Sequence, residues 1–356
     1  MSITTLGASW QNIALSQTFS QTGRETEGLH YYTSVYPTMT VSKDVNWTTY
    51  RIILLTKSQD PLTMHFLMAA SLIDLATLRN YDPTVCHAAR SHAKAGMLLL
   101  EEALDPEAMS DPVAVLTASF FLYRYMAIAK ELEPSRMAEW SRNICDYVER
   151  NRLDDMCGRA EPGSVLSHAK HGNAQESLTR PMRVHLARLI LWTFYEDIFA
   201  GIGGYGGFLA RRMCDEPLRA RDLYRHSGAE LECFWGQDYP ESQIIDDIES
   251  APILAFLYEV MALYAEVNKL AASPYHSAED VAALEAKIDK LEAVGNLVLR
   301  SLTISLTNRH LVLWFSLAPY DDYHAAPFPL DAECRLHGSV LLRPSNILLQ
   351  MLLART

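Results

Sequence analysis

The segment that most constrains the fold is a long helical stretch, residues 180–207, that runs into a cluster of glycines. Its sequence is RPMRVHLARLILWTFYEDIFAGIGGYGG. Apolar side chains occur all around this helix rather than along one stripe, which is typical of a helix at the centre of a domain. Glycine has no side chain and favours the turns that end helices. We therefore expect a central helix around which the rest of the chain packs.

Two adjacent acids, Glu196 and Asp197, lie in the last turns of this predicted helix. Carboxylates there face the negative end of the helix dipole, which costs roughly 0.3–1 kcal/mol when they are exposed. An arginine, another hydrogen-bond donor or a metal ion must offset this cost. Because Arg183 and Arg188 lie on the same helix, we expect an arginine partner.

Most of the remaining chain also shows helical patterns. Pairs such as Asp60-Pro61 combine a capping side chain with a proline in the first turn and predict helix starts. Neither an alternating strand pattern nor an internal repeat is present, so the sequence predicts an all-α fold, a single multi-helix bundle. Residues 1–28 are expected to form a flexible N-terminal arm and residues 29–356 one all-helical domain. Helices are predicted over about 61–80, 84–104, 111–131, 135–151, 250–271, 278–305 and 344–354, and loops over 152–178, 208–240 and 318–337.

Composition limits the class of protein. With 356 residues, 49% of them hydrophobic, the chain can bury a large core. No apolar run reaches the ~18 residues of a membrane span, and no secretory signal is recognisable, so we expect a cytoplasmic protein. The six cysteines contain no C-x-x-C pair and are expected to be reduced. A net charge of −12 argues against direct binding of nucleic acid.

Four stretches resemble a known family. They are HYYTSVYPTMTV (30–41), DPLTMHFLMAASLIDLA (60–76), VAVLTASFFLYRYMAI (113–128) and ARLILWTFYEDIFAGIGGYGG (187–207). In order and spacing they resemble the fungal-specific transcription factor domain, a helical regulatory region that follows a binuclear zinc cluster. The sequence lacks the six-cysteine cluster of that family, so DNA binding by the family's route is not expected. Asp74 also stands where these helices usually carry a histidine or an apolar residue.

In its all-helical character and size the chain also resembles the atypical humulene synthases of fungal tropolone sesquiterpenoid pathways. This resemblance implies a class I cyclisation of farnesyl diphosphate in secondary metabolism. Magnesium would bind the diphosphate, a lysine would help to hold it, and apolar walls would fold the farnesyl chain. The expected partners are thus an isoprenoid diphosphate and Mg²⁺, and a homodimer is left open.

Acids next to apolar helix surface are the candidates for binding Mg²⁺, which prefers carboxylate oxygens. Asp246 and Asp247 precede a predicted helix, although their spacing departs from D-D-x-x-D, and Glu259 lies farther along that helix. Lys269 follows as the candidate diphosphate-binding residue. The alternative is structural: an acidic lead-in favoured by the helix dipole, and a surface ion pair between Glu266 and Lys269.

Aromatic and apolar side chains on the same helices are candidates for a wall that stabilises a carbocation. Core packing is the alternative for each of them. A cluster of arginines in 208–240 alternates with acids and is expected to neutralise itself rather than bind phosphate. The candidate wall residues are Trp192, Tyr195, Tyr258, Met261 and Tyr264.

Two functions follow as hypotheses. The first is a non-canonical, magnesium-dependent terpene cyclase that converts farnesyl diphosphate to a humulene-type sesquiterpene. The alternative is a stand-alone transcription regulator or interaction protein, which would act in the nucleus. A third is another pathway enzyme, such as a metal-free cyclase, that uses the same cavity. The hypotheses differ in whether the acids converge on one site.

Overall fold

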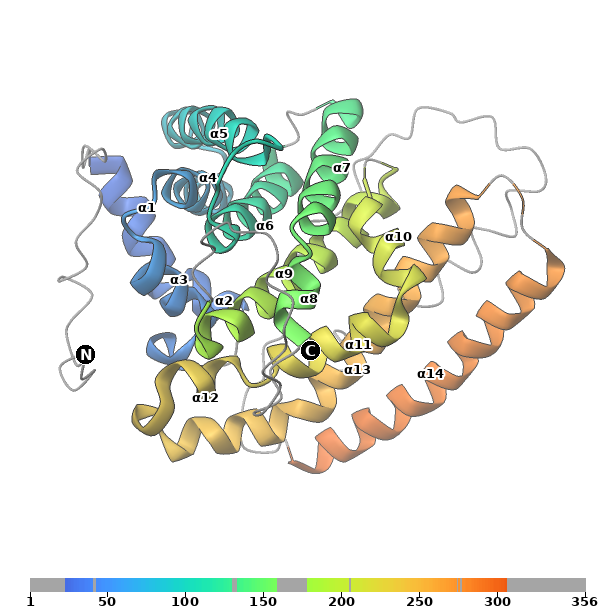
Figure 1. Cartoon of the computed structure of the whole chain (residues 1–356). Helices are drawn as coiled ribbons and strands as arrows, with labels where there is room; N and C mark the ends of the chain where they lie inside the picture. The colour runs from blue at the N-terminus through green and yellow to red at the C-terminus, as the bar shows by residue number, and fades with distance from the viewer. Residues whose placement is uncertain are drawn as a thin grey trace, which may run out of the picture.

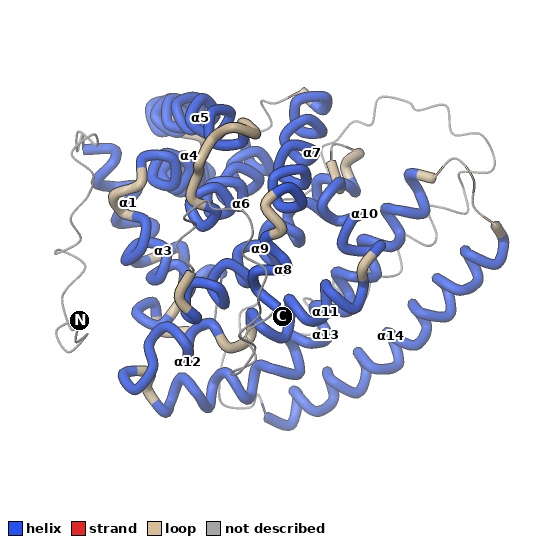
Figure 2. The backbone as a smooth tube through the Cα atoms, viewed as in Figure 1, coloured by secondary structure: helices blue, strands red, loops and turns tan. Residues whose placement is uncertain are grey.

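A computed structural model describes residues 23–40, 43–129, 133–158, 178–204, 206–273, 275 and 277–305. All regular elements in these ranges are helices, as Figures 1 and 2 show, which confirms the all-α prediction. Two short 3-10 turns, Val45–Trp47 and Gly236–Asp238, join them. The helices are α1 (Gly23–Ser34), α2 (Tyr36–Thr40), α3 (Thr49–Lys57), α4 (Pro61–Leu78), α5 (Pro83–Leu104), α6 (Pro112–Ala129), α7 (Pro134–Arg150), α8 (Leu153–Gly158), α9 (Arg180–Ile202), α10 (Phe208–Asp215), α11 (Pro217–Ser227), α12 (Glu230–Trp235), α13 (Glu241–Ala272) and α14 (Ala278–Ser305).

Aspartate caps set the starts of the first long helices, as the Asp-Pro pairs predict. The Asp60 carboxylate accepts a hydrogen bond from the backbone N–H of Thr63 at 2.7 Å. Asp82 accepts one from the N–H of Thr84 at 2.9 Å. Each cap satisfies a helix N–H that has no partner within the helix.

The core lies between α4, α6 and α9, and Figure 1 shows α9 in the middle of the molecule. Side chains on several faces of α9, including Leu186, Leu189 and Ile198, are fully buried. Helices α6, α8, α10, α11, α12 and α13 all pack against it. The predicted central helix is therefore confirmed.

Three parts of the chain differ from the prediction. Residues 208–240 are largely helical (α10 to α12) rather than irregular, and residues 153–158 form α8. Helix α1 begins at Gly23, inside the segment expected as an arm. It packs closely on α4 at Gly28, which has no side chain. A Cβ at this position would lie only 3.0 Å from the side chain of Leu72. Residues 1–22, 318–337 and 344–354 lie outside the described residues.

Helix α13 also differs, because it begins at Glu241 and continues through Pro252 instead of starting near residue 250. Proline lacks an N–H, so the carbonyl of Ile248 loses its usual helix partner. Ile248 is 68% exposed, so this turn of α13 lies at the surface.

The prediction that no apolar stretch is long enough for a membrane span is wrong for the described residues: α4, α6 and α13 are long and apolar enough to cross a membrane. In α4 and α6 about two thirds or more of the apolar window, 67% and 72%, is buried inside the molecule, against 44% in α13. The apolar character of α4 and α6 is thus explained by their place in the core.

Candidate functional site

Asp197, one of the two acids at the end of α9, is held by four donors rather than by an arginine. Its Oδ1 accepts hydrogen bonds from Ser141 Oγ (2.5 Å), Tyr123 Oη (2.8 Å) and the N–H of Gly207 (3.1 Å). Its Oδ2 accepts one from the N–H of Ala210 at 2.9 Å. Burial raises the pKa of Asp197, and these hydrogen bonds act in the opposite direction. The carboxylate caps the start of α10 and has a structural role.

Glu196, the second acid, does find an arginine, but not one of the two expected. Arg124 of α6 places Nη1 3.6 Å from Glu196 Oε1. The Nε of Arg124 donates to Tyr36 Oη at 3.2 Å. Arg183 instead donates to the carbonyl of Leu178. The predicted kind of partner is therefore correct, and its position in the chain is wrong.

A third ionisable side chain, Asp74 of α4, interacts electrostatically with this pair. Among the described residues its half-buried carboxyl makes no hydrogen bond or ion pair. We call Asp74, Arg124, Glu196 and Tyr36 the inner charge site. It joins three core helices, α4, α6 and α9, to α2.

The inner charge site carries too little positive charge for its acids. Burial raises the pKa of Asp74 to about 6, although Arg124 lowers it, and burial likewise raises the pKa of Glu196. Burial alone would lower the pKa of Arg124, but Tyr36 and the two acids raise it well above its usual value. With both acids ionised the site has a net charge of −1, so a cation or a hydrogen-bond donor would be favoured there.

Aromatic rings lie next to the inner charge site. The ring of Trp192 is 5.0 Å from Tyr50 and 4.9 Å from Phe120, measured between centroids. Tyr36 stands edge-on to Tyr50 at 5.2 Å. Side chains at Trp192 and Glu196 are one helical turn apart on α9 and both are partly exposed. The site thus combines acids with aromatic faces.

The three acids predicted to bind magnesium do not form one ligand set. Asp247 accepts a hydrogen bond from Tyr239 Oη at 2.6 Å and pairs with Lys43 at 2.5 Å. Glu259 pairs with Arg221 at 3.1 Å. Twelve residues of helix separate Asp247 from Glu259, about 18 Å at 1.5 Å per residue.

Asp246 lies beside Asp247 and accepts from Gln243 at 3.3 Å. In the described part of the chain no three His, Cys, Asp or Glu side chains form a group that could hold a metal ion. The residues present on α13 therefore do not fit a magnesium ion bound to all three predicted acids.

Lys269 is close to the surface and forms an ion pair with Asp215 at the end of α10. It does not pair with Glu266, which instead binds Lys287 of α14 at 2.5 Å. Lys269 and Asp215 have side-chain exposures of 46% and 61%. The lysine thus links α13 to α10 at the surface, away from the other predicted site residues Asp246 and Asp247.

The predicted wall residues all belong to the core or pack against it. Tyr195 of α9 interacts electrostatically with Tyr224 and Tyr258, and the last two rings are stacked at 4.5 Å. Met261 is 1% exposed and Tyr264 is 8% exposed on α13. Trp192 packs with the separate aromatic group at Tyr50 and Phe120.

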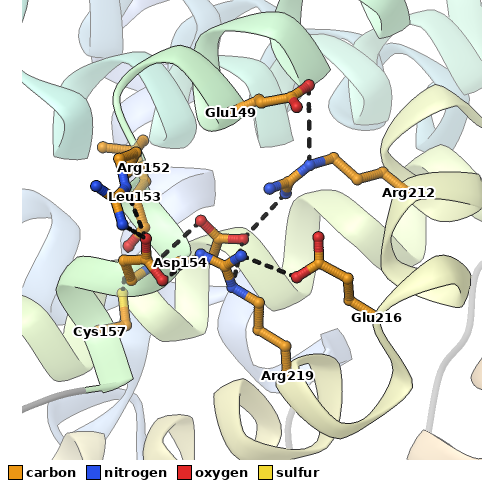
Figure 3. Close-up of polar contacts among 9 residues, drawn as sticks. Glu149, Arg152, Leu153, Asp154, Cys157, Arg212, Glu216 and Arg219 are labelled. Atoms are coloured by element: carbon orange, nitrogen blue, oxygen red, sulfur yellow. Dashed lines mark hydrogen bonds and ion pairs between the residues drawn. The ribbon is translucent and has the colours of Figure 1, made fainter.

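The arginines of 208–240 form ion pairs with acids, as expected, but the acid that two of them share lies outside that segment. Figure 3 shows Asp154 between Arg212 (3.0 Å) and Arg219 (2.9 Å). Arg219 also pairs with Glu216 at 2.8 Å. These contacts connect α8, α10 and α11, which explains why a strongly charged segment folds into helices here.

Sequence reasoning missed Arg124 as a site residue. The sequence did contain a signal for it: Arg124 is the single basic residue in the apolar stretch VAVLTASFFLYRYMAIA. A lone charge in such a helix is costly when buried and therefore has a partner.

Comparison of the chain with protein-family models, with curated proteins and with solved structures gave no match.

Proposed function

We propose that the chain is a helical regulatory domain that binds an effector at the inner charge site. The observation that carries this proposal is the half-buried Asp74, whose carboxyl has spare acceptor capacity beside Arg124 and Glu196. The effector is a molecule with an apolar body and a cationic or hydrogen-bond-donating group. This is the alternative that the resemblance to a regulatory domain implies.

Charge supports a cationic effector over a diphosphate. A buried site with a net charge of −1 repels a highly charged anion unless several metal ions accompany it. An ammonium group next to Asp74 would instead favour the ionised acid. The neighbouring rings of Trp192 and Tyr50 offer faces that attract cations.

Regulation can be tested by tethering the full chain to a heterologous DNA-binding domain in a yeast reporter strain. We expect reporter transcription to differ from that of the DNA-binding domain alone, and the difference to change with Asp74→Asn. Glu259→Gln, which alters an exposed acid, is the matched control and should behave as the wild type. Equal transcription from all four proteins would contradict the proposal.

Terpene cyclisation is a second candidate, favoured by one observation. Trp192, Tyr50 and Phe120 form an aromatic group, and aromatic faces can stabilise a carbocation. Purified protein would be incubated with farnesyl diphosphate, with and without Mg²⁺, and extracts analysed by gas chromatography–mass spectrometry. A magnesium-dependent sesquiterpene would establish this activity and displace the regulatory proposal.

A further inference from the structure

A second cluster of ionisable side chains lies far along α4 from the inner charge site. His65 of α4 and His92 of α5 face each other with their Nδ1 atoms 3.0 Å apart. Glu25 of α1 places Oε1 3.4 Å from Nε2 of His92. Three helices therefore meet at two imidazoles and one carboxylate.

The carboxylate determines how His92 carries its proton. With Glu25 at Nε2, that nitrogen holds a hydrogen, and Nδ1 presents its lone pair to His65. A carboxylate on the outer nitrogen of an imidazole is the usual support of a metal-binding histidine. His92 and Glu25 remain 11% and 19% exposed, so the cluster is not sealed from solvent.

We propose that His65 and His92 bind a transition-metal ion of the zinc class through their Nδ1 atoms, with Glu25 as the supporting carboxylate. The ion takes the place of the hydrogen between the two Nδ1 atoms. His65 stays neutral by changing tautomer: this proton moves, by exchange with solvent, from Nδ1 to Nε2 of the same ring, and no net proton is released. Water completes the coordination. The proposal is independent of the function of the inner charge site.

Binding of an ion requires both rings to move. Zinc–nitrogen bonds of about 2.0–2.1 Å in a tetrahedral site place two ligand nitrogens about 3.3 Å apart. The pair must therefore separate by a few tenths of an ångström. The ring centroids are 5.2 Å apart, so the two Nδ1 atoms point almost directly at each other. For both to point at one tetrahedral ion, each ring must turn by roughly 35°. The terminal torsion of histidine is broad and permits this turn.

Protonation also favours metal binding. Burial lowers the pKa of His65 and of His92, although Glu25 raises both. Neutral imidazole is the form that binds metal, and the lowered pKa values favour that form. Other charged groups of α1 are engaged elsewhere, since Glu27 pairs with Arg24 and Arg79.

The test is calorimetric titration of the full chain with zinc chloride at pH 7.5. His65→Asn should remove one zinc site that the wild type has. Glu25→Gln, which keeps both imidazoles, should weaken that site about tenfold. His87→Asn is the matched control, because His87 is exposed on the same helix as His92. Circular dichroism establishes that each variant is folded.

A second measurement covers the case in which His65→Asn does not fold. In the wild type, zinc should shift the Nδ1 resonances of His65 and His92 and leave those of His87 in place. Equal zinc binding by wild type, Glu25→Gln and a folded His65→Asn would overturn the proposal. So would unchanged Nδ1 resonances of the two rings at saturating zinc.

Discussion

Two adjacent acids of α9 have opposite surroundings. Asp197 receives four hydrogen bonds, two of them from the first residues of the α10 region. Glu196 shares a single arginine with Asp74, and the carboxyl of Asp74 has no hydrogen bond among the described residues. A buried acid with all its acceptors used stabilises the fold, whereas one with spare acceptors can bind something else. The contrast separates a structural acid of α9 from a site, shared by α4, α6 and α9, that can bind a ligand.

The largest expected effect is at the structural acid. Asp197→Ala leaves two buried hydroxyls and two backbone N–H groups without their acceptor. We expect the free energy of unfolding to fall by about 3 kcal/mol or more. Urea denaturation measures it, and a loss below about 1 kcal/mol would contradict the structural role.

The second-largest effect is expected in the glycine loop whose Gly207 N–H donates to Asp197. Gly207 has φ of +83°, and a side chain there would meet the Cα of Gly201 at 3.2 Å. Gly207→Ala should cost about 1–3 kcal/mol, through left-handed strain and this contact. Gly204 has φ of +77° with no atom within 4 Å, so Gly204→Ala measures the strain alone.

At Asp74 a substitution is expected to raise the free energy of unfolding rather than lower it. Burial raises the pKa of Asp74 from 3.8 to about 6, so the folded state binds its proton more tightly than the unfolded state. Its contribution to stability is present below pH 4 and is lost as the pH rises through 6. Asp74→Asn should therefore stabilise the protein at pH 7.5, by about 1–2 kcal/mol, and not at pH 4.

Urea denaturation of wild type and Asp74→Asn at several pH values measures that difference. A stability difference that does not change between pH 4 and 7.5 would show that Asp74 does not titrate in this range.

The smallest effect is expected on α13. Glu259 and Arg221 are 45% and 47% exposed, so their ion pair contributes little. Glu259→Gln should change the free energy of unfolding by less than about 0.5 kcal/mol. A large loss of stability, or loss of a bound Mg²⁺, would contradict this prediction and would support a role for the acids of α13 in binding metal.

Local rules predicted part of this fold. The all-round apolar sequence of α9 gave its central position, and the Asp60 cap gave the start of α4. Helices α10 to α12 were missed because ion pairs such as Arg219–Asp154, between segments 65 residues apart, hold them in place. Periodicity carries no information on such pairs.

The site was predictable to a similar extent. An arginine partner at the end of α9 was foreseen, but Arg124 comes from another helix, and only tertiary packing brings it to Glu196. The acids on α13 were grouped because they are near in sequence. Helical rise separates them instead, and each has a partner elsewhere.

The central claim is that Asp74 makes the inner charge site a binding site for cationic, apolar molecules. Calorimetric titration with 4-phenylbutylamine at pH 7.5 tests it most directly, with the uncharged 4-phenylbutanol as the matched ligand. The account predicts that wild type binds the amine more tightly than the alcohol and that Asp74→Asn loses this preference. Equal binding of the two ligands by the wild type, or an unchanged preference in Asp74→Asn, would contradict it.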